Sequence, residues 1–239
     1  MRVLLIHAFP MDASMWAAQQ RLDVDVVAPN LPGFGGSPSA GAVMTMEAAA
    51  ERCLEALGDT PAVVCGLSMG GYVAFELLRQ RPDLVAGLVL ANTRAEADDA
   101  QGREKRLALA DRLDAEGSGF LVAEPPPLLG AGAPGWLREQ VANTIAAQPA
   151  SAIAAAARGM AERPDSTALL ADIAVPTLVV TSSDDTLIPP EITAKIADGV
   201  PGARWATIEG AGHLSNLEAP EAFDELLLAH LERCRQARP

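Results

Sequence analysis

The chain has 239 residues, of which 49% are hydrophobic, so it can bury a sizeable core and suits one compact domain with an insertion. Its 18 lysines and arginines are outnumbered by 31 aspartates and glutamates, and the net charge of −13 argues against nucleic-acid or membrane-surface binding. Cys53, Cys65 and Cys234 lack CxxC spacing, and no apolar run approaches the roughly 18 residues of a membrane span, so a soluble, cytoplasmic protein is expected.

Short runs of Val, Ile and Leu alternate with longer Ala-, Leu- and Glu-rich segments, which is typical of βα units around a parallel sheet. These runs are continuously apolar, as strands covered by helices on both faces should be. Six strands are predicted: Val3–Ile6, Val24–Ala28, Ala62–Cys65, Val85–Leu90, Thr177–Thr181 and Arg204–Ile208. The predicted helices between and after them are Met46–Leu57, Gly71–Arg81, Glu191–Asp198 and Pro220–Arg235.

Residues 93–172 break this alternation, because Ala-rich and charged helical sequence continues there without a convincing strand. We interpret this region as a helical cap inserted into a core domain formed by residues 1–92 and 173–239. The fold predicted is therefore an α/β fold, with a mostly parallel sheet of about six strands flanked by helices.

The sequence Gly66-Leu67-Ser68-Met69-Gly70 matches the GxSxG pattern, and it lies between a predicted strand and a predicted helix. That context is the one a nucleophile elbow needs, with Ser68 in a strained conformation of positive φ. The glycines on either side allow neighbouring backbone to pass close by. The competing interpretation is a serine that caps the helix in a Gly-rich turn.

A serine hydroxyl needs a base to take its proton, and histidine is the usual base near neutral pH. Of the three histidines, His230 lies inside a predicted helix and His7 directly follows the first strand. His213 lies in a Gly-rich loop after the last strand, where its ring can reach the carboxyl edge of the sheet. His213 is therefore the candidate base, against the alternative of a loop histidine with a structural role.

The third member of a catalytic triad would be a carboxylate that orients the histidine. Asp184 and Asp185 follow the strand Thr177–Thr181, and both lie between Ser68 and His213 in the chain. The pattern of residues leaves both candidates open, and the other aspartate would then have a loop or capping role.

With these residues in place, the chain resembles the α/β-hydrolases, in the small bacterial branch of esterases and 3-oxoadipate enol-lactonases. The stretches that carry the resemblance are His7-Ala8-Phe9-Pro10-Met11-Asp12, Leu31-Pro32-Gly33-Phe34-Gly35-Gly36-Ser37, Gly66-Leu67-Ser68-Met69-Gly70-Gly71, Ser183-Asp184-Asp185-Thr186-Leu187-Ile188-Pro189 and Gly212-His213. They lie on both sides of the insertion, which itself carries little family signal.

The resemblance implies a role for several residues. The acid of this family precedes a proline by four residues, which favours Asp185, because Pro189 follows it at that distance. The backbone N–H groups of Phe9 and Met69 would form the oxyanion hole, with His7 as scaffold of its loop. Ala8 stands where the family usually has glycine, which restricts φ there. The opening β-hairpin of the family is expected to be missing.

Two further residues are candidates for contact with substrate. Arg94 follows the strand Val85–Leu90 at the start of the cap, where its guanidinium could hold a substrate carboxylate. A surface salt bridge with Glu96, Asp98 or Asp99 is the competing interpretation. Trp136 lies in the cap and is the second candidate, against a plain packing role.

Together these features predict a serine hydrolase that cleaves a small carboxylic ester or lactone through an acyl-enzyme. The same triad could serve perhydrolase or haloperoxidase-like, C–C hydrolase or lyase chemistry, and a non-catalytic small-molecule binding protein is a more remote alternative. No cofactor and no metal are expected, since no nucleotide-binding motif or metal-ligand spacing is present. The sequence leaves the natural substrate and the oligomeric state open.

Overall fold

A computed structural model of the chain describes residues 1–237. Six parallel strands form one sheet in the order β2-β1-β3-β4-β5-β6. The strands are β1 (Arg2–Ile6), β2 (Asp25–Val27), β3 (Ala62–Leu67), β4 (Val85–Ala91), β5 (Thr177–Ser182) and β6 (Arg204–Ile208). Each contains or overlaps a predicted strand, so the predicted parallel sheet is confirmed.

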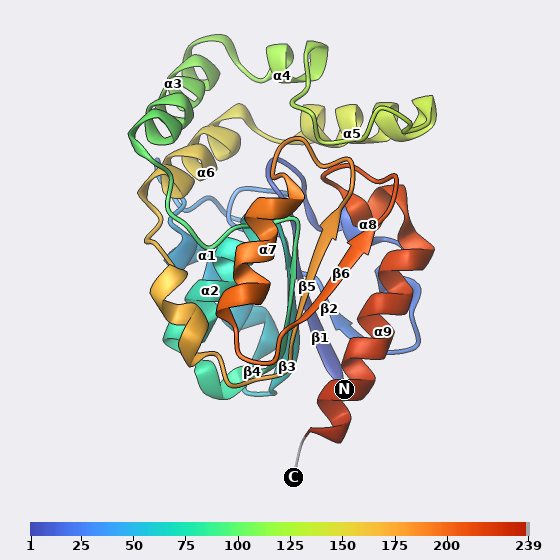
Figure 1. Cartoon of the computed structure of the whole chain (residues 1–239). Coiled ribbons are helices and arrows are strands. Elements are labelled where there is room, and N and C mark those ends of the chain that lie inside the picture. The colour runs from blue at the N-terminus through green and yellow to red at the C-terminus, as the bar shows by residue number, and fades with distance from the viewer. Residues whose placement is uncertain (238–239) are drawn as a thin grey trace.

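Helices cover both faces of the sheet. Figure 1 shows α1 and α2 on one face and α9 on the other. The helices are α1 (Met46–Leu57), α2 (Met69–Gln80), α3 (Ala100–Glu116), α4 (Gly119–Ala123), α5 (Gly135–Ala147), α6 (Ala150–Glu162), α7 (Pro190–Gly199), α8 (Ser215–Glu218) and α9 (Pro220–Gln236). Short 3-10 helices occupy Ala13–Trp16, Gln19–Arg21, Pro82–Leu84 and Thr167–Asp172.

The core is formed by the central strands and the helices that face them. Every residue of β3 and β5 is buried, as continuously apolar strands between two helical layers should be. The edge strands β2 and β6 are more exposed and shorter than β4. A bilayer-spanning helix is not found among residues 1–237, because none is both long and apolar enough.

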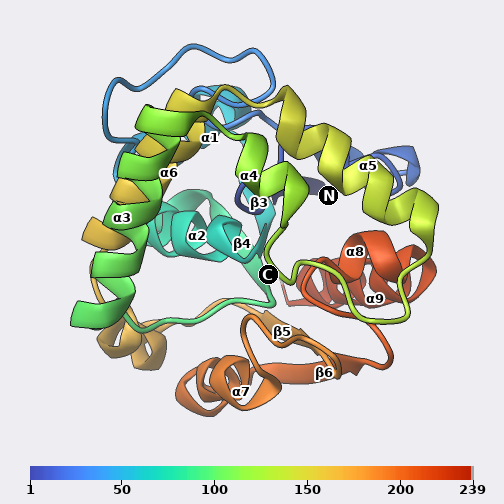
Figure 2. The ribbon, with the colours of Figure 1, turned by 90° about the horizontal axis from the view of Figure 1, so that it is seen from above.

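The segment between β4 and β5 consists of helices α3 to α6 and contains no strand, as its composition predicts. These helices lie over one end of the sheet (Figure 1), and the view from above shows α3, α4 and α5 arranged around that end (Figure 2). The end they cover is the one where the parallel strands finish. In an open α/β sheet this carboxyl edge is the usual place for a ligand site.

The largest shift from the predicted boundaries occurs where β3 meets α2. The strand continues to Leu67 and the helix begins at Met69, two residues before its predicted start. Only Ser68 separates the two elements, so the chain reverses direction within one residue. That tight turn places the serine side chain at the carboxyl edge of the sheet.

Candidate active site

Ser68 has the strained backbone that its motif predicts. Its φ is 56° and its ψ is −114°, a conformation that costs energy for any residue with a Cβ. Its N–H donates to the Ala91 carbonyl at 2.9 Å, and its own carbonyl accepts from Thr93 Oγ1 at 2.8 Å. The end of β4 therefore holds the turn in place, and the side chain remains 8% exposed.

The two motif glycines make this turn possible by leaving out a side chain. A Cβ on Gly66 would overlap the carbonyl group of Gly70, and a Cβ on Gly70 would overlap the carbonyl of Ile6. Neither collision can be relieved, because both partners are backbone atoms. The GxSxG spacing is thus explained by the packing of β1, β3 and the start of α2.

His213 and Asp185 form a buried pair beside this turn. Their Nδ1 and Oδ2 atoms are 2.8 Å apart, and both side chains are fully buried. Asp184, the other candidate, is exposed, and its carboxylate accepts from the hydroxyl of Ser183. The structure therefore brings Asp185 to His213 and leaves Asp184 on the surface.

Four donors surround the Asp185 carboxylate. The backbone N–H groups of Leu187 and Ile188 both donate to Oδ1 at 2.9 Å, and Asn92 Nδ2 donates to Oδ2 at 2.9 Å alongside His213. Burial alone would raise the pKa of this carboxyl, but His213 and the other donors hold it below its usual value. An ionised carboxylate only accepts, so His213 Nδ1 carries a hydrogen and Nε2 is left as the acceptor.

Asn92 is a site residue that the sequence analysis did not single out. It is fully buried, has a positive φ of 46°, and also donates to Ser182 Oγ at 2.8 Å. Its Oδ1 accepts from Ser215 Oγ at 2.7 Å, so one amide links the ends of β4 and β5 and the start of α8 to the Asp185 carboxylate. A polar residue directly after a buried strand was the available signal, since such positions converge at the carboxyl edge.

The nitrogen of His213 that faces away from Asp185 has no competing partner. Nε2 is buried and has no hydrogen-bond partner among residues 1–237. Ser68 Oγ therefore does not donate to it in this structure. Unliganded active sites often hold their catalytic hydrogen bonds long or poorly aligned. The atom that would take the serine proton is therefore available.

Phe9 and Met69 are the residues whose amides the family resemblance predicts as an oxyanion hole. Their amides are absent from the turn, loop and cap hydrogen bonds of residues 1–237. Met69 is also the first residue of α2, whose positive dipole end stabilises negative charge. Ala8 is not among the positive-φ residues of the described chain. Alanine can therefore adopt the backbone conformation of this loop, although the family usually has glycine at this position.

The other two histidines, His7 and His230, are buried in structural positions away from this role as a base. His7 Nδ1 lies 3.0 Å from the Ala8 carbonyl, and its Nε2 accepts from the Leu31 N–H at 3.1 Å. Burial lowers the pKa of His7 to about 4, so the ring is a neutral brace between two loops. His230 lies in α9, and burial likewise lowers its pKa to about 4.

A cavity of about 450 Å³ opens at Ser68, between the strand ends and the helical segment above them. Such a volume suits a small molecule. Its walls combine residues of the sheet side with residues of α3, α4 and α6. The lining residues are Phe9, Pro10, Ser68, Tyr72, Arg94, Asp98, Gly102, Lys105, Arg106, Leu109, Leu121, Pro126, Leu128, Met160, Leu187 and Ile188.

Of the two predicted substrate contacts, the structure places Arg94 in this cavity and Trp136 outside it. Trp136 is 64% exposed on α5 and lines a separate surface hollow with Asp12 and Ser14. The first turn of α5 directs this side chain to the outside, so the structure does not bring this predicted substrate contact to the cavity.

The salt bridge considered as the alternative role of Arg94 is not formed among residues 1–237. Glu96 instead pairs with Lys195 at 2.9 Å, and Asp98 pairs with Arg163 and Arg106. Asp99 caps α3 by accepting from the Gly102 N–H. Within the same residues, no group of three or more His, Cys, Asp or Glu side chains could hold a metal ion.

Sequence comparison gives this geometry a family context. Residues 3–226 match the alpha/beta hydrolase family. A proposed carbamate hydrolase from Azorhizobium caulinodans is 32% identical over 189 residues, which cover 74% of this chain and 68% of that protein. A proposed non-heme bromoperoxidase from Mycobacterium tuberculosis is 31% identical over 197 residues, which cover 77% of this chain and 73% of that protein.

Structural comparison agrees with the sequence matches. A thermophilic esterase from Thermogutta terrifontis, solved with malate bound, superposes with a TM-score of 0.93. It is 39% identical to this chain, and the match covers 98% of this chain and 90% of the esterase. The predicted resemblance is confirmed by both comparisons.

Proposed function

The chain belongs to the alpha/beta hydrolase family and is a hydrolase, and from this premise we propose that it cleaves a small carboxylic ester or lactone through Ser68. The observation that carries the proposal is the buried His213–Asp185 pair, whose free Nε2 lies at the same sheet edge as the strained serine. Identity of 39% to an esterase supports an ester as substrate. Residues 93–172 would act as the cap over the site.

The proposed reaction begins with attack of Ser68 Oγ on the carbonyl carbon of the substrate. His213 Nε2 takes the hydroxyl proton as the C–O bond forms, and the Asp185 carboxylate stabilises the resulting imidazolium. The negative charge moves to the carbonyl oxygen, where the N–H groups of Phe9 and Met69 would receive it. In other hydrolases one such donor is worth about 3–4 kcal/mol of transition-state stabilisation.

The intermediate then collapses and the ester C–O bond breaks. The leaving alkoxide takes the proton from His213, which leaves an acyl group on Ser68. Water attacks this acyl-enzyme and gives its proton to His213, and the carboxylic acid departs as Ser68 Oγ recovers that proton. Atoms and charges balance over the two half-reactions, and no cofactor is consumed.

A panel of short-chain aryl esters and lactones tests the proposal on the wild-type protein and on Ser68→Ala. We expect the wild type to turn over at least one class and the variant to lose kcat by several orders of magnitude with its fold intact. Circular dichroism of both proteins checks the fold. Turnover by Ser68→Ala at a rate near that of the wild type would contradict the proposal.

Perhydrolysis is a second candidate, because one relative with 31% identity is named as a bromoperoxidase. In that reaction hydrogen peroxide would replace water in the attack on the acyl-enzyme and release a peracid. Adding peroxide to the same panel distinguishes the two outcomes. Peracid formation that exceeds hydrolysis in the wild type and vanishes in Ser68→Ala would favour perhydrolysis.

A further inference from the structure

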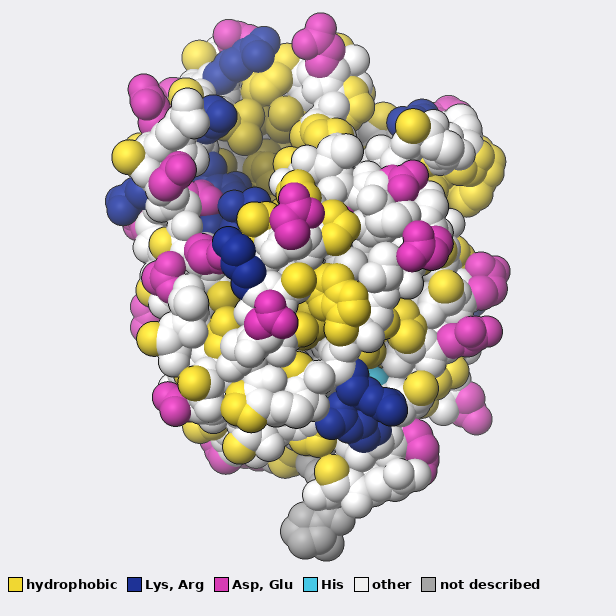
Figure 3. Space-filling model, in the orientation of Figure 1, with side chains coloured by type: hydrophobic (Ala, Val, Ile, Leu, Met, Phe, Trp, Pro, Cys, Tyr) yellow, Lys and Arg dark blue, Asp and Glu magenta, His cyan; other side chains and the backbone are white. Residues whose placement is uncertain are grey.

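The cavity at Ser68 carries positive charge in a protein that is otherwise acidic. Its lining includes Arg94, Lys105 and Arg106 but only one carboxylate, that of Asp98. The whole chain shows the opposite balance, with 31 acidic and 18 basic residues. On the face seen in Figure 3, several basic side chains lie beside a hollow in the upper part of the molecule, another basic group lies lower down, and acidic side chains are spread over the whole face.

The single carboxylate of the cavity is already committed to two other cations. Arg163 Nη2 donates to Asp98 Oδ1 at 2.8 Å, and Arg106 Nε donates to Asp98 Oδ2. Burial alone would raise the pKa of Asp98, but these two arginines lower it to about 2. Asp98 is therefore shared between Arg163 and Arg106 and is not available to Arg94 or Lys105.

Neither of the two remaining cations has a carboxylate of its own. No ion pair of Arg94 or Lys105 is found among residues 1–237. Glu96 lies close enough to Arg94 to feel its charge, but its hydrogen bond goes to Lys195. Burial of the Arg94 guanidinium without an ionic partner costs desolvation free energy, and a bound anion would offset that cost.

The other walls of the cavity are mostly apolar, which limits the kind of anion that fits. Side chains from both the sheet side and the helical segment form this surface. They are Phe9, Pro10, Leu109, Leu121, Pro126, Leu128, Met160, Leu187 and Ile188. A short aliphatic chain that ends in a charged group would satisfy both parts of the lining.

We propose that the cavity selects esters or lactones that carry a carboxylate, which Arg94 and Lys105 bind while Ser68 attacks the ester carbonyl. This inference rests on the function proposed above and names its substrate class. Arg94 offers the planar fork of donors that matches a carboxylate, and Lys105 adds a mobile point charge from α3. The two cations come from different elements, the loop after β4 and α3, so the carboxylate would connect these two elements.

A pair of substrates that differ only in charge tests this inference. The anionic member is the mono-p-nitrophenyl ester of adipic acid, and the neutral one is p-nitrophenyl 6-methylheptanoate, in which an isopropyl group replaces the carboxylate. The measured quantity is the ratio of kcat/KM for the anionic to the neutral ester. Ser68→Ala supplies the background rate for each, including any attack by the substrate's own carboxylate.

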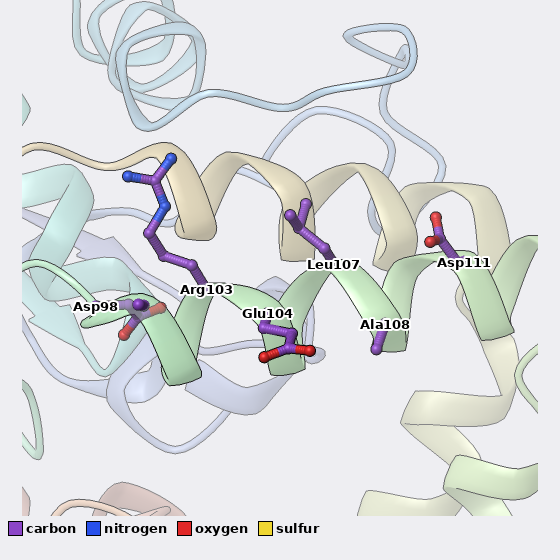
Figure 4. A pocket seen from close by; sticks show the side chains of 7 residues that line it. Asp98, Arg103, Glu104, Leu107, Ala108 and Asp111 are labelled. Atoms are coloured by element: carbon purple, nitrogen blue, oxygen red, sulfur yellow. The ribbon is translucent and has the colours of Figure 1, made fainter.

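We expect the wild type to prefer the anionic ester and Arg94→Gln to lower the ratio about 10- to 100-fold, mostly through KM. Lys105→Gln should lower it less, since its ammonium is exposed and mobile. Arg103→Gln is the matched control, because Arg103 lies on the same helix but lines a separate hollow with Glu104 and Leu107 (Figure 4). That control should leave the ratio as in the wild type.

The outcomes separate this inference from the function on which it rests. Ser68-dependent hydrolysis with a ratio that neither Arg94→Gln nor Lys105→Gln changes would overturn the carboxylate site and leave the esterase proposal standing. Loss of all Ser68-dependent hydrolysis would instead overturn the esterase proposal. In that case calorimetry with adipate decides the inference, since binding to Ser68→Ala must weaken when Arg94→Gln is added.

Discussion

The carboxyl ends of the strands and the helical segment above them are built in opposite ways. At the strand ends, Asp185 and Asn92 are buried and each of their oxygens has a defined donor. In the cavity wall above, Arg94 and Lys105 have no ion pair within residues 1–237 and keep access to solvent. Under the two proposals above, the sheet would preorganise the catalytic groups, whereas Arg94 and Lys105 would bind the substrate as their first ionic partner.

The largest expected effect lies in the preorganised region. His213→Gln removes the proposed proton acceptor of Ser68, so kcat for a small ester should fall about 10⁴- to 10⁶-fold. Steady-state kinetics with a p-nitrophenyl ester measures this loss, and His230→Gln serves as a control for loss of a buried histidine. A His213→Gln enzyme within tenfold of the wild type would show that another group is the base.

The next effect distinguishes two neighbouring carboxylates. Asp185→Asn keeps the size of the side chain but removes the charge that fixes the His213 tautomer, so kcat should fall about 10²- to 10⁴-fold. Asp184→Asn is the matched control, because Asp184 is exposed and its carboxylate accepts from the Ser183 hydroxyl and not from His213. An equal or larger loss in Asp184→Asn would contradict the assignment of the acid.

Stability should depend on pH through the histidine that braces the site. Burial lowers the pKa of His7 from 6.5 to about 4, so between these values the unfolded chain binds more protons than the folded one. The contribution of neutral His7 to the free energy of unfolding is therefore complete above pH 6.5. As the pH falls to 4, the free energy of unfolding should decrease by about 3 kcal/mol. Urea unfolding at pH 7 and pH 4.5 measures the change.

The pH slope can be assigned by removing the titrating group. His7→Asn should flatten the dependence between pH 6.5 and pH 4, although it also lowers stability at neutral pH. His230 contributes to the same window, since its pKa is likewise lowered to about 4, so part of the slope should remain. A slope that is identical in His7→Asn and the wild type would show that His7 is not neutral in the folded state.

A smaller effect is expected at the amide that links the strand ends. Asn92→Ala removes a donor to Asp185 and leaves the Ser215 hydroxyl without its acceptor, which should cost about 1–3 kcal/mol of folding stability. The rate should fall less than in Asp185→Asn, since the carboxylate keeps its three other donors. Chemical unfolding and ester kinetics on one preparation check both statements. An Asn92→Ala protein as stable as the wild type would contradict the first, and a rate as low as that of Asp185→Asn would contradict the second.

The smallest effect is expected in the helical segment. Trp136→Ala should change kcat/KM for small esters less than about twofold, because the indole is exposed and lines a hollow away from Ser68. The same kinetic assay measures it. A tenfold loss of kcat/KM would mean that Trp136 contacts the substrate. The binding region would then have to include α5.

The two regions also differ in how well their site residues could be predicted from the sequence. The GxSxG motif imposed the turn at Ser68, since glycine alone tolerates the backbone contacts of Gly66 and Gly70. The strand ends were recognisable as apolar runs followed by polar residues, and parallel strands bring such residues to one edge. For that reason Asp184 or Asp185 could be proposed together with His213, and the family resemblance, through Pro189, favoured Asp185.

The cavity wall could not be predicted in the same way. The helices of residues 93–172 were evident, but α3 is polar on most of its surface, so periodicity does not reveal which side faces the cavity. Lys105 and Arg106 were not predicted as cavity residues for this reason. Asn92 was missed because its role arises from four segments that meet only in the folded chain.

Covalent labelling of the nucleophile tests the central claim most directly. A fluorophosphonate probe should add once to the wild-type protein, and peptide mass spectrometry should place the adduct on Ser68. We predict no adduct on Ser68→Ala and strongly slowed labelling of His213→Gln, because the hydroxyl then lacks its base. An unlabelled wild-type protein, or an adduct that persists in Ser68→Ala, would contradict the account.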